Sequence, residues 1–214
     1  MRRLIVYIDG FNLYYGIRKT SYRWLNLQRL AESILPNRDV LSVKYFTARV
    51  LPFPKDPSAP QRQEIFLRAL RTLKKVEIIE GRFQVKPISL PLEKPPNTVV
   101  RVLRSEEKGS DVNLASHLLM DAFEDSFDDG AVISADSDLA MPVNMVAKSF
   151  GKPIYIFDPR PAGKECCDLR SVATQYRRIW GSVYKKCLLP NPVIDQAGRA
   201  IHMPPGWDSP KVLI

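Results

Sequence analysis

Acidic side chains follow apolar segments at two points of the 214-residue chain, where strands are expected to end. Asp9 lies in the run YIDGFN, directly after a short apolar run, and Asn12 follows three residues later. Asp136 and Asp138 lie in the run SADSDLA, after a second apolar run. Two carboxylates this close repel each other unless a cation or protons offset their charge.

A third acid, Asp111, lies in the run EKGSDVNLASHLLMDAF, in the first turn of an expected helix. Counting by helical steps places it on the apolar face of that helix, with Leu118 and Ala122. An acid on a face that packs on a sheet needs a partner. The acids near the far end of the helix are instead predicted to be solvated surface charges: Asp121, Glu124 and Asp125.

Together, Asp9, Asp111, Asp136 and Asp138 would form an all-oxygen group suited to a hard divalent cation, Mg²⁺ or Mn²⁺. Three of the four acids also have a purely structural explanation. Asp9 could form an Asx-type turn, Asp138 could cap a helix, and Asp111 could interact with a helix dipole.

Other metal-binding and redox residues form no such pattern. We interpret His117 as an ordinary helix side chain, and His202 lies near the C-terminus. The three cysteines, Cys166, Cys167 and Cys187, have the spacing of neither a disulfide framework nor a zinc site, so a reducing compartment is expected.

The elements that would position these acids alternate between strand and helix. Branched apolar runs predict strands over residues 4–8, 40–50, 76–80, 131–134 and 153–157, with a weaker one over 98–103. Helical periodicity predicts helices over about 27–34, 65–73, 112–123 and 169–179, the first capped by Asn26, and a further helix from 139 that stops at Gly151. This alternation predicts an α/β fold with a mostly parallel central sheet and helices on both faces. If the strand order reverses between the first strand and the one before Asp136, Asp9 and Asp136 face each other across the switch point.

Prolines mark the expected irregular segments. One loop is predicted around residues 52–60, and a longer one contains Pro87, Pro91, Pro95 and Pro96. We expect one domain over residues 1–182, followed by a proline-containing segment over 183–214 that drapes over the domain or is disordered. The N-terminal apolar run is too short for a signal peptide, and no run reaches the roughly 18 residues of a membrane helix. A cytoplasmic protein is therefore expected.

The formal net charge of +9 favours a polyanionic partner such as nucleic acid, although a merely basic protein would carry the same charge. Lys108 is the best candidate phosphate contact, because it precedes a helix N-terminus. Further candidates for backbone contact or base stacking are Arg104, Arg160, Lys164 and Tyr14, although a tyrosine at this point could also belong to the core.

At its acidic motifs the sequence resembles the NYN domain family of the PIN-like nuclease superfamily, including its bacterial branch. The matching runs are VYIDGFNLYYG, EKGSDVNLASHLLMDAF and SADSDLAMPV, and their order agrees over about residues 4–180. The resemblance implies a Rossmann-like PIN fold and metal-dependent hydrolysis of RNA, less often of DNA. It also implies that Asp9, Asp111, Asp136 and Asp138 hold Mg²⁺ or Mn²⁺, with Asn12 orienting water or the metal shell.

Other functions stay open at this point. A binding module of the same fold could hold RNA with little turnover, although such a module has no physical need of four repelling carboxylates. An aspartyl-phosphate enzyme usually has a second acid two residues after the first, where this chain has Phe11. A dinucleotide enzyme would have a glycine-rich fingerprint after the first strand, which is missing here. A homodimer is possible.

Overall fold

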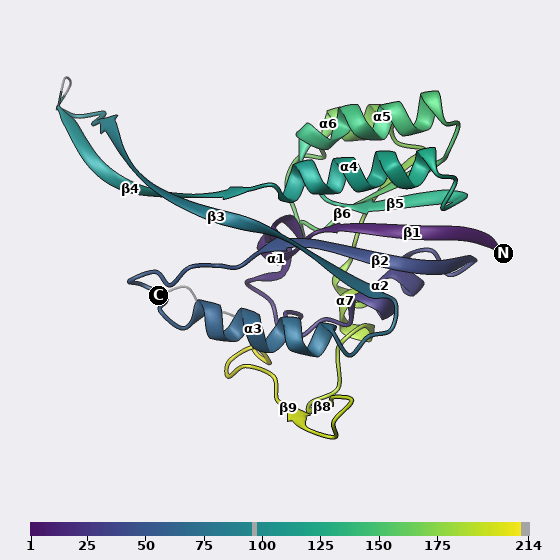
Figure 1. The fold of residues 1–214 in the computed structure, drawn as a ribbon, viewed down its shortest axis with the longest axis horizontal. Coiled ribbons are helices and arrows are strands. Elements are labelled where there is room, and N and C mark those ends of the chain that lie inside the picture. The colour runs from purple at the N-terminus through teal and green to yellow at the C-terminus, as the bar shows by residue number, and fades with distance from the viewer. Residues whose placement is uncertain (96–97, 211–214) are drawn as a thin grey trace.

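A central sheet of seven strands organises the protein. The computed structural model describes residues 1–95 and 98–210. The strand order is β4-β3-β2-β1-β5-β6-β7 (Figure 1). All neighbouring strands are parallel except β3 and β4, which pair antiparallel. The predicted α/β class with a mostly parallel sheet is therefore confirmed.

The bounds of the strands are β1 Arg2–Asp9, β2 Arg38–Ala48, β3 Val76–Pro91, β4 Val99–Lys108, β5 Asp129–Ile133, β6 Ile154–Asp158 and β7 Gln175–Arg178, with the short pair β8 Val193–Ile194 and β9 Ala200–Ile201. The helices are α1 Gly10–Ile17, α2 Leu27–Ile34, α3 Ala59–Leu70, α4 Ser110–Phe123, α5 Ala140–Ser149, α6 Cys167–Val172 and α7 Gly181–Lys186. A 3-10 helix, η1, covers Ser137–Leu139.

Helices cover both faces of the sheet, because the central strands are apolar on both sides. In β1, Val6 and Ile8 belong to the cluster under α1, α2 and α3, whereas Ile5 and Tyr7 belong to the cluster under α4, α5 and α6. A strand buried on both faces reads as one continuous apolar run, which is how β1 appears in the sequence. Figure 1 shows the α4–α6 layer and α3 on opposite sides of the sheet.

Close approach of the backbone explains Gly10, which begins α1 directly after β1. A Cβ atom at this position would lie 2.5 Å from the Phe46 carbonyl oxygen and 2.8 Å from the Tyr45 ring. Any side chain here would push α1 away from β2. The absence of a side chain therefore lets the chain turn sharply after Asp9.

The prediction of a long proline-containing loop is wrong for part of its length. Strand β3 continues through Pro87 as far as Pro91 and pairs with β4 to form a two-stranded ribbon that extends from the sheet (Figure 1). β2 pairs with β3 only as far as Gly81. Beyond that point one edge of β3 is unpaired, so prolines without an N–H group are tolerated there. Pro96, in the same predicted loop, lies outside the described residues.

The helix predicted over 169–179 is also wrong in its second half. α6 ends at Val172, and the chain then forms β7, whose residues pair with β6 from Tyr155 to Asp158. The Thr174 amide already donates to the Ile154 carbonyl at 2.8 Å. Pairing with the sheet therefore overrides the helical periodicity of this short segment.

The described part of the C-terminal segment, through residue 210, packs against the α3 side of the domain. Leu189, Ile201 and Trp207 share a small core with Trp24 and Ala69. The Trp24 indole also donates to the Pro190 carbonyl at 2.9 Å. Of the two expected arrangements, draped or disordered, the described residues adopt the draped one. The domain boundary at residue 182 stays a prediction.

The structure contains no sign of a membrane helix within its described residues. None of their helices is both long enough and apolar enough to pass through a bilayer.

Asp121 was predicted to be a surface charge, and this prediction is wrong. Its side chain is buried, accepts a hydrogen bond from the Tyr7 hydroxyl at 2.6 Å and pairs with Lys44 Nζ at 2.7 Å. Position 121 lies seven residues after Leu114 and three after Leu118, both buried. The helical spacing therefore contained the signal for a sheet-facing position.

We expect Asp121→Asn to lower the free energy of unfolding by about 3 kcal/mol, because Lys44 would keep a buried charge without an acidic partner. Replacing both residues, as Lys44→Met with Asp121→Leu, should recover most of that loss. Urea denaturation of the three proteins measures the difference. An Asp121→Asn variant as stable as wild type would contradict the importance of this buried pair.

Candidate metal centre

Three carboxylates converge at the carboxyl edge of the sheet. Asp9 ends β1, Asp136 follows β5, and Asp111 lies in the first turn of α4. Each offers one oxygen atom, and the three oxygen atoms lie within 4.8 Å of one another. β1 lies between β2 and β5, so the strand order reverses at β1 as inferred from the sequence. That reversal places residues from distant parts of the chain side by side.

Asp9 is held in place by three hydrogen bonds. Its Oδ1 accepts from the Asn12 amide at 3.0 Å, and its Oδ2 accepts from Asn12 Nδ2 at 2.8 Å and from Ser134 Oγ at 2.9 Å. The side chain is only 3% exposed. Burial raises the pKa of Asp9 above its ordinary value, although these hydrogen bonds oppose the shift and the Asp136 charge adds to it.

Asn12 connects the two strand ends. In addition to its bonds to Asp9, its Oδ1 accepts from the Ala135 amide at 3.3 Å. The side chain therefore links the turn after β1 to the loop after β5. That Asn12 orients water or the metal shell stays a prediction.

Ser134 is a site residue that the sequence analysis missed. Its buried hydroxyl donates to Asp9 Oδ2 and accepts from the Asp136 amide at 3.1 Å. It therefore fixes the backbone of Asp136 relative to the carboxylate of Asp9. A serine directly between a buried strand and the acidic pair was the available signal.

Asp138 lies apart from the three converging carboxylates. Its side chain is exposed, and its backbone amide donates to Asp136 Oδ1 at 3.0 Å. Asp136 thus caps η1, the arrangement that the sequence analysis considered for Asp138 itself. Asp138 is close enough to raise the pKa of Asp111, but it is outside the 4.8 Å group. Its predicted ligand function stays a prediction.

Asp111 carries the largest electrostatic cost of the three. Burial and the charges of Asp9, Asp136, Glu107 and Asp138 raise its pKa to about 6. Glu107, a second residue missed from the sequence, also accepts from the Ser110 amide at 3.0 Å. The charges around Asp111 are therefore mutually unfavourable without a cation.

The donor set fits a hard divalent cation. All of the converging ligand atoms are carboxylate oxygens, which Mg²⁺ and Mn²⁺ prefer, and a cation would offset the repulsion that raises the pKa of Asp111. The hydroxyl of Ser110 is buried beside Asp111 and has no hydrogen-bond partner among the described residues. An unsatisfied hydroxyl at this point is consistent with a water molecule of a metal shell.

Two of the predicted phosphate contacts lie on β4 and share one acid. Lys108 Nζ pairs with Glu106 at 3.0 Å, and Arg104 Nε pairs with the same residue at 2.7 Å. Both cations are more than half exposed. On the facing strand, Arg82 lies directly opposite Lys108 and Lys86 opposite Arg104. These four cations share the one acid Glu106, so this part of the ribbon has an excess of positive charge. Like charges in opposed pairs are unfavourable, and an anionic ligand would offset that repulsion.

The other predicted contacts follow β6. Arg160 is bound to the buried Asp158, with Nη2 to Oδ2 at 2.8 Å, which leaves its guanidinium largely occupied. Lys164 is exposed, and its carbonyl accepts from Arg160. Of this pair, Lys164 therefore has the freer side chain.

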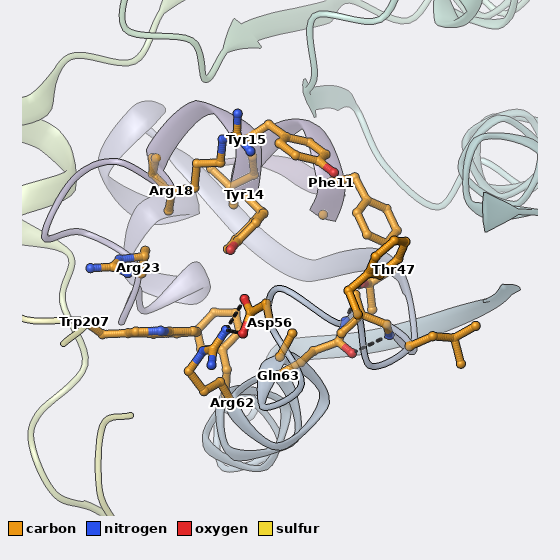
Figure 2. A pocket seen from close by; sticks show the side chains of 18 of the residues that line it. Phe11, Tyr14, Tyr15, Arg18, Arg23, Thr47, Asp56, Arg62, Gln63 and Trp207 are labelled. Carbon is orange, nitrogen blue, oxygen red and sulfur yellow. Dashed lines mark hydrogen bonds and ion pairs between the residues drawn. The ribbon is translucent and has the colours of Figure 1, made fainter. Parts of the chain in front are cut away.

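A cavity of about 570 Å³ is lined by Gly10 and Phe11, the two residues that follow Asp9. Tyr14, predicted to stack on bases or to join the core, is partly exposed and lines this cavity. Figure 2 shows it opposite Trp207 and the ion pair of Arg62 and Asp56.

Comparisons with known proteins identify the family of the chain. A family model described as NYN domain matches residues 3–179. A curated relative from Pseudomonas putida, named 6-hydroxy-3-succinoylpyridine 3-monooxygenase HspA, is 31% identical over 172 residues, or 67% of this chain. The chain spans 55% of that relative's length. A crystal structure of a protein of unknown function from Vibrio parahaemolyticus has a TM-score of 0.53 at 19% identity, over 88% of this chain and 96% of that one. This second likeness shows the fold alone.

We expect Asp111→Asn to stabilise the metal-free protein at pH 7.5. The raised pKa means that the folded state binds a proton more readily than the unfolded state between about pH 4 and 6. Wild type should therefore lose stability as the pH rises through this window, by about 1–2 kcal/mol after discounting for solvent screening of a half-buried group.

Denaturant unfolding in EDTA at pH 4 and 7.5 measures this effect. The variant should exceed wild type at pH 7.5 and match it near pH 4, and Mg²⁺ should reduce the difference by stabilising wild type. A variant less stable than wild type at pH 7.5 would show that Asp111 is not under electrostatic strain.

Proposed function

Because the chain belongs to the NYN domain family, we propose that it is a metal-dependent nuclease, and specifically an endoribonuclease that requires Mg²⁺ or Mn²⁺. The observation that carries this proposal is the convergence of Asp9, Asp111 and Asp136 within 4.8 Å in a chain of net charge +9. Acids hold the cation, and the surrounding Lys and Arg side chains attract the phosphodiester backbone.

The chain's own residues would act in distinct ways. Asp9, Asp111 and Asp136 would hold the cation, with Asp138 at the edge of the group as a further ligand through water. Asn12 and Ser134 would keep Asp9 and Asp136 at a fixed separation through the hydrogen bonds described above. A bound divalent cation lowers the pKa of a water molecule and offsets charge on the leaving oxygen.

The substrate would approach over the positively charged side of the site. Lys108 directly precedes Gly109 and the N-terminus of α4, where helix dipole and ammonium both favour an anion. Arg104 would extend this contact along β4, and Lys164 would add a second contact from the loop after β6, where Arg160 mainly positions the loop. RNA is the favoured substrate on the family resemblance. The free cysteines suit the reducing cytoplasm.

We expect Asp136→Asn to lower cleavage of single-stranded RNA by at least about 100-fold, because one of three cation ligands loses its charge. Asp39→Asn serves as the matched control. Asp39 is exposed at the start of β2, at the opposite edge of the sheet, and its variant should cut like wild type.

The assay uses labelled single-stranded RNA, structured RNA and single-stranded DNA, each with Mg²⁺, Mn²⁺ or EDTA. Cleavage in EDTA, or full activity of Asp136→Asn, would refute the metal-dependent proposal. RNA binding by both proteins without any cleavage would favour a regulatory RNA-binding module of the same fold.

A second candidate function is the oxygenation of a small heteroaromatic compound. The relative from Pseudomonas putida is named as a monooxygenase of such a compound, and an aromatic-lined cavity adjoins Asp9 in this chain. Oxygen uptake with a hydroxypyridine and an electron donor tests it. Uptake that persists in Asp136→Asn while no nucleic acid is cut would favour this function over the nuclease.

We expect Lys108→Ala to weaken RNA binding by the metal-free protein and to reduce the slope of log affinity against log salt by about one unit. Filter binding between low and moderate salt measures both quantities. Lys148→Ala, an exposed change in the last turn of α5, should leave the slope unaltered. Equal slopes for wild type and Lys108→Ala would exclude Lys108 as a phosphate contact.

A further inference from the structure

We propose that the cavity beside the acids is a binding site for one planar aromatic ring that carries an anionic group. Such a ring could be a nucleotide of a bound strand or a free heteroaromatic acid. The inference does not depend on nuclease activity, because none of the three converging carboxylates lines the cavity. Its volume, about 570 Å³, is in the range of small-ligand sites, roughly 300–1,000 Å³.

Aromatic side chains from separate parts of the chain form the walls. Phe11 and Tyr14 come from α1, Phe53 from the loop after β2, Phe66 from α3 and Trp207 from the C-terminal segment. Figure 2 shows Tyr14 facing Trp207 across the cavity. Aromatic rings on several sides suit a flat ring, which gains stacking energy from each ring face that it covers.

Positive charge surrounds the same space. Among the described lining residues, four are cationic and only Asp56 is acidic, and Asp56 pairs with Arg62. Arg18 contacts the Tyr15 ring, and neither Arg18 nor Lys55 forms an ion pair within the described residues. Both side chains are exposed at the rim. This imbalance favours a ligand with a phosphate or carboxylate group outside the aromatic walls.

One buried polar atom of the cavity wall has no hydrogen-bond partner among the described residues. This atom is Ser105 Oγ, which lines the cavity beside Phe83. Phe83 packs edge-on against Phe11, 5.7 Å between ring centroids, and Phe11 follows Asp9 by two residues in the chain. A buried hydroxyl without a partner is costly unless a ligand or water satisfies it. A ring with a polar edge, such as a nucleobase or a pyridine, would supply that partner.

The C-terminal segment completes the cavity. Arg23, 3% exposed, donates to the carbonyl oxygens of Gly206 and Ser209, and its guanidinium lies 5.9 Å from the Trp207 ring centroid. These bonds hold Trp207 against Phe66, at 5.8 Å between ring centroids. The segment after residue 182 therefore contributes a wall of the site and not only surface packing.

Calorimetric titration of the whole protein in EDTA tests the inference. The ligands are adenosine 5′-monophosphate, uridine 5′-monophosphate and pyridine-3-carboxylate, with ribose 5-phosphate, inorganic phosphate and adenosine as probes lacking the ring or the charge. We expect saturable binding of at least one ring-bearing anion, and binding at least fivefold weaker by each of the three probes. Tighter binding of the nucleotides identifies a strand as the source, and tighter binding of the pyridine acid identifies a free metabolite.

Phe53→Ala should weaken this binding by about tenfold through lost stacking. Phe53 is 58% exposed, so its loss should not unfold the protein, and Phe150→Ala on the opposite face is the matched control. Lys55→Ala should remove most of the preference for adenosine 5′-monophosphate over adenosine.

Three outcomes would overturn the inference: no saturable binding of any ring-bearing anion, equal binding of inorganic phosphate, or an unchanged affinity in Phe53→Ala. Binding as expected by a protein that cuts no RNA would refute the nuclease and leave the cavity assignment intact. RNA cleavage by a protein that binds no ring-bearing anion would refute the cavity assignment and leave the nuclease proposal intact.

Discussion

The site depends on one constraint: three carboxylates are held closer together than their charges favour. Asp9 is buried, and Asp111 has a pKa raised to about 6 by burial and by its acidic neighbours. Asn12 and Ser134 keep Asp9 beside the loop that carries Asp136, because both bond to Asp9 and to that loop. Asp111 is brought to them by the first turn of α4. A crowded set of acids fixed by neutral hydrogen-bond partners is an arrangement whose energy improves when a divalent cation binds.

The same edge of the sheet brings the remaining features together. Gly10 lets the chain turn directly after Asp9, and the next residue, Phe11, forms part of both the turn and the cavity wall. The ribbon of β3 and β4 carries Lys108 to the N-terminus of α4, and it contributes Phe83 and Ser105 to the wall of the cavity. Acids, cations and aromatic rings therefore meet where the strand order reverses, which is the expected place for a ligand in an open parallel sheet.

Much of this arrangement could be predicted from the sequence. The continuous apolar runs of the inner strands and the acids after two of them were sufficient to predict the fold class and the meeting of Asp9 with Asp136. Asp111 could be added because helical steps place it on the sheet-facing side. The same counting, applied to Asp121, would have shown that this acid is buried too.

Other features depended on tertiary pairing that no local pattern contains. β7 forms in a segment with helical periodicity because β6 offers an unpaired edge. β3 continues through Pro87 because its pairing with β2 ends at Gly81, so the proline lies on an edge where no N–H group is needed. The hydrogen bonds of Ser134 link strands more than a hundred residues apart in sequence. The cavity likewise joins α1, α3 and Trp207, so only the folded chain shows it.

The central claim is that Asp9, Asp111 and Asp136 form a divalent-cation site. Crystals grown or soaked with Mn²⁺, with anomalous diffraction recorded for wild type and Asp136→Asn, test it most directly. The account predicts an anomalous peak in contact with these three carboxylates in wild type and a lost or much weaker peak in the variant. A Mn²⁺ peak elsewhere with none between these acids, in fully soaked wild-type crystals, would contradict it.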